Sequence, residues 1–235
     1  MRQAAPVSTP LPVTDRTRFT RYRERQVTDR PALYDVLDHA LVAHVAVVRG
    51  EGEQAVAAVL PVASARDGDS LLLHGSTGAG LLRAAAEGRT VTATVTVLDG
   101  LVVARTVFDS SMNYRCAVVF GVPVVVADDE KEAALRVLSE HLVPGRWDEV
   151  RRPTRRELAA TLVLRLPLDE ASVKVRADGP DEDEPEDRGV WAGVLPLHTA
   201  VGAPRTGDDV PAGVPVPASV PAAADRLASW TPPYR

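Results

Sequence analysis

The chain contains one cysteine, Cys116, which excludes a disulfide framework and any zinc or iron–sulfur site built from several cysteines. It has no run of roughly 18–20 uncharged apolar residues, so the sequence predicts no membrane-spanning segment. The residues after Met1 lack the apolar stretch of a signal peptide, which predicts a cytoplasmic protein. Aromatic residues make up only 4% of the chain, so we expect an aliphatic core.

Positive charge is also scarce. The 27 lysines and arginines are outnumbered by 32 acidic residues, and no basic stripe is present, so we expect no nucleic-acid or membrane partner. Nearly all of the positive charge is arginine, and with abundant Ala, Val and Pro this bias is typical of a GC-rich bacterial genome. The five histidines show no HxxxH or HxH spacing, which predicts that the chain has no metal site.

The rest of the composition is that of an ordinary globular domain, 45% hydrophobic and 25% charged. Short Val- and Leu-rich runs between turn residues predict six strands, a number that favours a closed antiparallel barrel or a sandwich. The Asp99–Gly100 pair predicts a two-residue hairpin turn between two of them. The predicted strands cover residues 43–49, 55–63, 70–74, 91–98, 101–107 and 114–127.

Three helices are expected beside these strands, which gives a mainly β fold with flanking helices. Apolar residues at helical spacing predict helices over residues 31–41 and 128–142. The Ala- and Leu-rich segment 80–87 predicts another helix, with Gly88 as its C-terminal cap. A further strand is predicted over residues 161–168.

Changes in composition divide the chain into segments. The folded domain is predicted to span residues 16–176, after a flexible arm over 1–15. An acidic linker is predicted over 177–190, because this run has almost no apolar content. The apolar segment 191–198 is expected to dock back on the domain, and 199–235 is a Pro-rich tail that we expect to be poorly ordered.

The segment from His74 to Arg83, HGSTGAGLLR, predicts the end of a strand, a loop and the start of a helix. The N–H groups of a helix start, the hydroxyls of Ser76 and Thr77 and the guanidinium of Arg83 could together bind a phosphate. The alternative is a plain helix cap with Arg83 in solvent. The segment is neither a P-loop nor a dinucleotide fingerprint, because Leu81 and Arg83 stand where those motifs need Lys and Gly.

Two other segments are candidates for a ligand site. Pro61, between Leu60 and Val62, belongs at a sheet edge or a bulge, where backbone groups could pair with a flat heteroaromatic ligand; an ordinary edge-strand proline is the alternative. Residues 113–115 form a polar cluster between two predicted strands, which indicates either a site or a turn. Cys116 lies in an apolar run and is expected to be a small buried residue and not a nucleophile.

Four blocks in this order resemble the pyridoxamine 5′-phosphate oxidase-related flavoproteins, in the branch that includes nitroimidazole-resistance proteins. The blocks are LLLHGSTGAGLLR, AEGRTVTATVTVLDGLVVAR, SMNYRCAVVFG, and EASVKVR followed by WAGVLPL, and the resemblance covers about residues 20–198. The basic substrate-phosphate residues of authentic pyridoxamine phosphate oxidases are not found. The resemblance implies an FMN-binding split β-barrel, a Greek-key antiparallel barrel, and a homodimer with the flavin at the subunit interface.

The resemblance also implies roles for individual residues. Arg83, Ser76 and Thr77 would hold the FMN phosphate. The backbone of Leu60, Pro61 and Val62 would face the isoalloxazine edge. His74 is the nearest candidate for a catalytic residue. The other implied site residues are Asn113, Tyr114 and Arg115, which would line the site, and Trp191, which would either close the flavin pocket or cover the barrel core.

An FMN-dependent oxidoreductase acting on a small molecule is the function that the resemblance implies, with the flavin carrying the hydride chemistry. Two alternatives stay open. One is a non-catalytic flavin- or haem-binding protein on the same fold, with His74 as an axial haem ligand. The other is a dimeric scaffold without a cofactor. The sequence does not specify whether the electron donor is a nicotinamide nucleotide or a deazaflavin.

Overall fold

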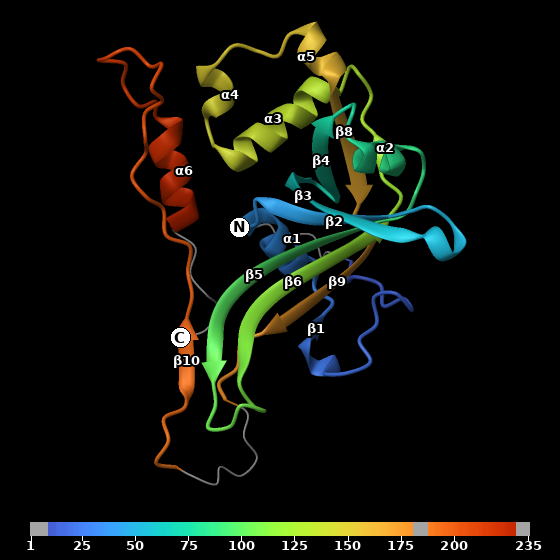
Figure 1. The fold of residues 1–235 in the computed structure, drawn as a ribbon, viewed down its shortest axis with the longest axis vertical. Coiled ribbons are helices and arrows are strands. Elements are labelled where there is room, and N and C mark those ends of the chain that lie inside the picture. Colours follow the sequence, from blue (N-terminus) through green and yellow to red (C-terminus); the bar gives the residue numbers. More distant parts are fainter. Residues whose placement is uncertain (1–8, 181–187, 229–235) are drawn as a thin grey trace, which may run out of the picture.

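The computed structural model describes residues 9–180 and 188–228. Its ten strands form one sheet in the order β1-β9-β6-β5-β2-β3-β4-β8-β7, with β10 along β5, and all pairings are antiparallel (Figure 1). The strands are β1 (Gln26–Val27), β2 (Val42–Arg49), β3 (Val56–Asp67), β4 (Ser70–Ser76), β5 (Val91–Val103), β6 (Ser111–Gly121), β7 (Val124–Val125), β8 (Thr161–Pro167), β9 (Glu170–Arg176) and β10 (Gly193–Pro196).

The helices flank this sheet, and α3, α4 and α5 gather at the end of the molecule where β4 and β8 lie (Figure 1). The three helices predicted from the sequence are confirmed as α1, α2 and α3. None of the helices in the described residues is long and apolar enough to cross a membrane. The helices are α1 (Arg30–His39), α2 (Gly80–Ala86), α3 (Lys131–Leu142), α4 (Arg146–Glu149), α5 (Arg155–Ala160) and α6 (Ser219–Ala228), with short 3-10 turns η1 (Arg23–Arg25) and η2 (Gly52–Gln54).

One long strand joins the two parts of the sheet. Residues 56–63 of β3 pair with β2, and residues 64–67 pair with β4. The main core lies between α1 and the strands, and it is aliphatic, as the low aromatic content predicts. A second, smaller cluster packs α3 on β4 and β8 through Leu72, Leu138 and neighbouring apolar residues. The predicted mainly β fold with flanking helices is therefore confirmed.

The predicted hairpin turn at Asp99–Gly100 is wrong. Strand β5 runs without reversal from Val91 to Val103, and both sides of the predicted turn pair with the same neighbour, β6. The register shifts between Leu98 and Gly100, so Asp99 is the extra residue of a β-bulge. Asp99 is fully buried and binds Arg115 of β6, whereas a turn would expose it.

The chain outside residues 16–176 has more regular structure than its composition suggests. In the arm, Leu11 is buried and its N–H donates to the carbonyl of Thr28; residues 1–8 lie outside the described part. Residues 181–187 of the acidic linker also lie outside it. In the Pro-rich segment, helix α6 is anchored by hydrogen bonds from Ser219, whose backbone N–H donates to Glu149 over 2.9 Å.

Candidate functional site

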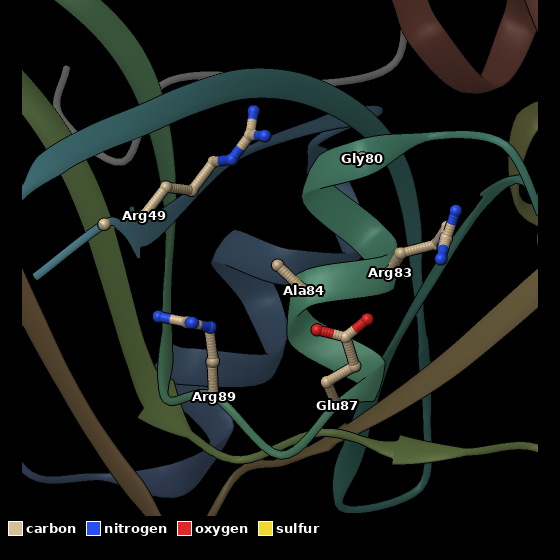
Figure 2. Close-up of a pocket in the computed structure, with 7 residues that line it drawn as sticks. Arg49, Gly80, Arg83, Ala84, Glu87 and Arg89 are labelled. Atoms are coloured by element: carbon tan, nitrogen blue, oxygen red, sulfur yellow. The ribbon is translucent and has the colours of Figure 1, made fainter.

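Three arginines are among the residues that line an open pocket beside α2, called the arginine pocket below (Figure 2). Arg49 is the last residue of β2, Arg83 belongs to α2, and Arg89 lies between α2 and β5. The pocket has a volume of about 380 Å3. Its other lining residues are Gly50, Gly80, Ala84 and Glu87.

The guanidinium groups lie on both sides of α2. Arg49 and Arg89 stand on one side of the helix, and Arg83 extends from the other (Figure 2). Gly80 leaves room for Arg49, whose Nη1 lies 4.0 Å from the position that a Cβ on this glycine would take. Arg89 donates to the carbonyl oxygen of Val48 over 3.2 Å. Within residues 9–180 and 188–228, the side chains of Arg49 and Arg83 make no hydrogen bond or ion pair, and guanidinium groups in this state suit a bound phosphate.

Of the three predicted phosphate ligands, Arg83 lines the arginine pocket, whereas Ser76 and Thr77 do not. Ser76 ends β4, and its Oγ accepts a hydrogen bond from the N–H of Gly78 over 3.1 Å. Thr77 donates its N–H to the carbonyl of Ala160. Both side chains are exposed, and their predicted contact with a phosphate stays a prediction.

Leu60, Pro61 and Val62 lie in the half of β3 that pairs with β2. The other edge of residues 56–63 has no strand partner within the part of the chain that the structure describes, which matches the edge position predicted for Pro61. Val59 and Leu60 are 53% and 51% exposed. Because consecutive residues of a strand point to opposite faces, both faces of this strand are uncovered here.

Arg115 is the centre of a buried ion network. Its Nε and Nη2 donate to the two carboxylate oxygens of Asp99 over 3.1 and 3.2 Å, and its Nη1 donates to Asp35 of α1 over 2.7 Å. Burial raises the pKa of the Asp99 carboxyl above its usual value, although the neighbouring Arg115 acts in the opposite direction. The contacts of Arg115 join β5, β6 and α1.

Asn113 and Tyr114 lie beside this network in β6. The Oδ1 of Asn113 accepts a hydrogen bond from Arg176 over 2.6 Å, and its Nδ2 donates to the carbonyl of Asp178 over 2.9 Å. The ring of Tyr114 faces the Lys174 ammonium, 5.7 Å from its centroid. Residues 113–115 do not line the arginine pocket, so their contribution to a shared site between subunits stays a prediction.

A second cavity is lined by three histidines and is called the histidine cavity below. His39 ends α1, His44 lies in β2, and His198 follows β10. The Nδ1 of His39 lies 2.6 Å from the carbonyl oxygen of Asp35 and 3.3 Å from its carboxylate. The volume is about 530 Å3. The other lining residues are mostly apolar: Ala40, Leu41, Val42, Thr96, Val97, Leu98, Leu197, Thr199 and Leu227.

His74 and Trp191 line neither of these two pockets. His74 lies opposite Val163 in the pairing of β4 with β8, and its Nδ1 is buried without a hydrogen-bond partner among the described residues. Trp191 is 66% exposed, so it does not cover the core of this chain. Its ring lies against Gly193, where a Cβ would come within 2.8 Å of the indole. A role for Trp191 over a flavin stays a prediction.

Sequence reasoning missed Arg49, Arg89 and the three cavity histidines. These residues are far apart in the chain or lack a motif, and only the strand pairing brings them together.

Within the described residues, no group of three or more His, Cys, Asp or Glu could hold a bare metal ion. Burial raises the pKa of the Cys116 thiol, which agrees with the expected lack of nucleophilic character.

Comparison with known proteins gives one family and several similar structures. The model of the pyridoxamine 5′-phosphate oxidase family matches residues 29–175. Among curated proteins, no sequence matches the chain.

Two solved structures are similar over most of their length. The FAD and haem binding protein from Mycobacterium smegmatis is 46% identical, with a TM-score of 0.81, over 85% of this chain and 97% of that one. The flavocytochrome Anf3 from Azotobacter vinelandii is 32% identical, with a TM-score of 0.82, over 89% and 96% of the two chains. A protein from Bacteroides thetaiotaomicron named for 5-nitroimidazole antibiotic resistance has the same fold, at 18% identity and a TM-score of 0.53, over 64% and 86% of the chains.

Proposed function

Because the chain belongs to the pyridoxamine 5′-phosphate oxidase family, we propose that it is a flavin-dependent redox protein whose cofactor phosphate binds in the arginine pocket. The observation that carries this proposal is the pair Arg49 and Arg83, which have no partner for their guanidinium groups within the described residues. Arginines bind phosphate oxygens through paired N–H groups, so this pocket fits the phosphate end of a flavin nucleotide.

The family resemblance implied FMN, and we extend the proposal to FAD. The M. smegmatis protein, 46% identical to this chain, is named for FAD binding. The FAD pyrophosphate carries two phosphate groups, and the arginine pocket offers guanidinium groups on two sides of α2 (Figure 2). Several guanidinium groups in one pocket are compatible with a diphosphate as well as with a single phosphate.

The bound flavin would supply the electron or hydride transfer, and the protein would supply binding and orientation. The backbone of Leu60, Pro61 and Val62 lies on an unpaired strand edge, where its N–H and C=O groups could bond the edge of the flavin ring. We propose an oxidoreductase activity toward a small molecule on this basis. His74 of β4 lines neither pocket of this chain. It would take part in that reaction if a second copy of the chain placed its flavin beside β4.

A homodimer is part of the same proposal. Val59 and Leu60 are half exposed and point to opposite faces of β3, so both faces of the strand present apolar surface to solvent. A second copy of the chain would bury this apolar surface. The unpaired edge of β3 belongs to the same surface. A flavin lying on this edge would then contact both subunits.

Replacing Arg49 or Arg83 with alanine is expected to weaken FAD and FMN binding by roughly 10- to 100-fold, because a hydrogen bond to a charged group contributes ~1.5–3 kcal/mol. Riboflavin has no phosphate, so its affinity should stay the same in both variants. Fluorescence titration of the three flavins measures this difference. Arg136→Ala, an exposed arginine on α3, is the matched control. Equal losses for riboflavin and FAD would contradict the phosphate assignment.

Haem binding is the second candidate function. It is favoured by two structures of high similarity, one named for FAD and haem binding and the other a flavocytochrome. We propose that this chain likewise binds a haem in addition to the flavin. Titration of the purified protein with haemin, followed by the Soret band, tests this function separately from the flavin titration.

A further inference from the structure

The edge of β5 that faces β2 and β10 contains a gap. Strand β2 pairs with β5 as far as His44 and Thr94. Strand β10 begins its pairing at Gly100, opposite Pro196, and the N–H of Leu197 donates to the carbonyl of Asp99 over 2.9 Å. Between Thr94 and Asp99 this edge has no strand partner within residues 9–180 and 188–228.

The histidine cavity lies in this gap. Its wall includes Thr96, Val97 and Leu98, which belong to the unpaired stretch of β5. Both β2 and β10 run antiparallel to β5, so the end of β10 points toward the beginning of β2. His198, which follows β10, and His44, near the beginning of β2, therefore come to the cavity from opposite sides. Leu227 of α6 adds an apolar wall.

The chemistry of this cavity matches haem. Haem iron is bound axially by histidine in many proteins, and the porphyrin needs apolar walls. The cavity combines imidazoles with leucine and valine side chains, and its volume of about 530 Å3 lies within the roughly 300–1,000 Å3 of cofactor and ligand sites. His44 and His198 reach the cavity from the two ends of the gap, and their imidazoles would supply the nitrogen ligands that a haem iron takes.

We propose that a haem would bind in the histidine cavity, with His44 and His198 as the residues that would hold its iron. This inference rests on the haem-binding part of the proposed function. His39 lines the same cavity, but Asp35 holds its ring through Nδ1, so we assign it to the wall and not to the iron. His74, the ligand expected from the sequence, lies in the β4–β8 pairing and outside this cavity.

The test uses the full chain, reconstituted with haemin, and compares wild type with His44→Ala and His198→Ala. Each variant should lower the affinity for haemin by ~10-fold or more. Each should also convert a low-spin, six-coordinate spectrum to a high-spin one, measured by absorption and electron paramagnetic resonance. His74→Ala is the matched control and should keep the wild-type spectrum. Leu98→Trp keeps all histidines but fills the cavity, and it should also weaken haemin binding.

Two results would overturn the site assignment while the haem function stands. One is a wild-type spectrum and affinity in both His44→Ala and His198→Ala. The other is loss of the low-spin signal in His74→Ala or His39→Ala while the two cavity variants keep it. If the wild-type chain binds no haemin, the haem function and this site both fail. Far-UV circular dichroism and urea unfolding of the same variants detect misfolding independently of both cofactors, because His44 pairs with Pro61 on the strand assigned to the flavin ring.

Discussion

Replacing Arg115 with alanine is expected to lower the free energy of unfolding by about 3–5 kcal/mol, a large part of the stability of a typical domain. The Arg115 side chain is 7% exposed, and Asp99, which it binds through two nitrogens, is fully buried. The substitution leaves the Asp99 carboxylate without this partner. Arg136→Ala, which removes an exposed ion pair with Asp148, should cost less than about 1 kcal/mol. Urea unfolding of the three proteins measures both effects.

The loss of unfolding free energy in Arg115→Ala should also depend on pH. Burial already raises the pKa of Asp99, so the folded chain takes up this proton at higher pH than the unfolded chain does. A raised carboxyl pKa stabilises the fold at acid pH, and this contribution is lost as the pH rises through the folded pKa. Without Arg115 the pKa of Asp99 rises further. The loss of unfolding free energy relative to wild type should therefore be smaller at about pH 5 than at about pH 8. Equal deficits in unfolding free energy at both pH values would contradict a buried carboxylate that has lost the Arg115 guanidinium.

A double variant separates the charge from the packing. Replacing Arg115 with methionine and Asp99 with leucine removes both buried charges and keeps apolar volume in the site. Buried ion pairs are often replaced in this way without loss of stability, so this protein should regain most of the stability that Arg115→Ala loses. A double variant as unstable as the single one would show that the geometry of the network, and not its charge balance, supports the fold.

Introducing two charges on β3 is expected to convert a dimer into a monomer. Val59 and Leu60 are half exposed on opposite faces of an unpaired edge strand, which is the surface we assign to a second copy of the chain. Replacing both with glutamate would bury four carboxylates in a symmetric interface, at a cost of several kcal/mol. Light scattering should give twice the mass of the 25.1 kDa chain for wild type and a single chain for the variant.

Val107→Glu is the matched control, because Val107 is 95% exposed and lies outside β3. It should remain dimeric. Flavin affinity adds a second readout: if the cofactor lies between subunits, the monomeric variant should bind FAD more weakly than wild type. A wild-type monomer that retains bound flavin would contradict the shared interface.

Local patterns predicted the helices well because each has its own signal. Helix α2 combines Ala and Leu with a glycine after its end, and the hydrophobic spacing of α1 and α3 is regular. The Asp99–Gly100 prediction was wrong because the pair lies within a continuous strand, where Asp99 is the extra residue of a bulge. Only the pairing of both flanks with β6 distinguishes this bulge from a turn.

The candidate sites were predicted less completely than the fold. Arg83 was found because it follows a Gly-rich loop, a local feature. Arg49 and Arg89 reach the same pocket from the end of β2 and from the segment after α2, and no motif links them. His44 and His198 are separated by most of the chain, and the register of β2 and β10 on β5 brings them to one cavity. Contacts of this kind depend on topology and have no local sequence signal.

The most direct test of the central claim is the absorption spectrum of the purified full-length protein after incubation with FAD and haemin and removal of the unbound cofactors. Two separate sites, the arginine pocket and the histidine cavity, predict both flavin bands and a Soret band in the same protein, with each cofactor retained when the other is omitted. A protein that shows neither set of bands would contradict the account and favour a scaffold that has the fold without a cofactor.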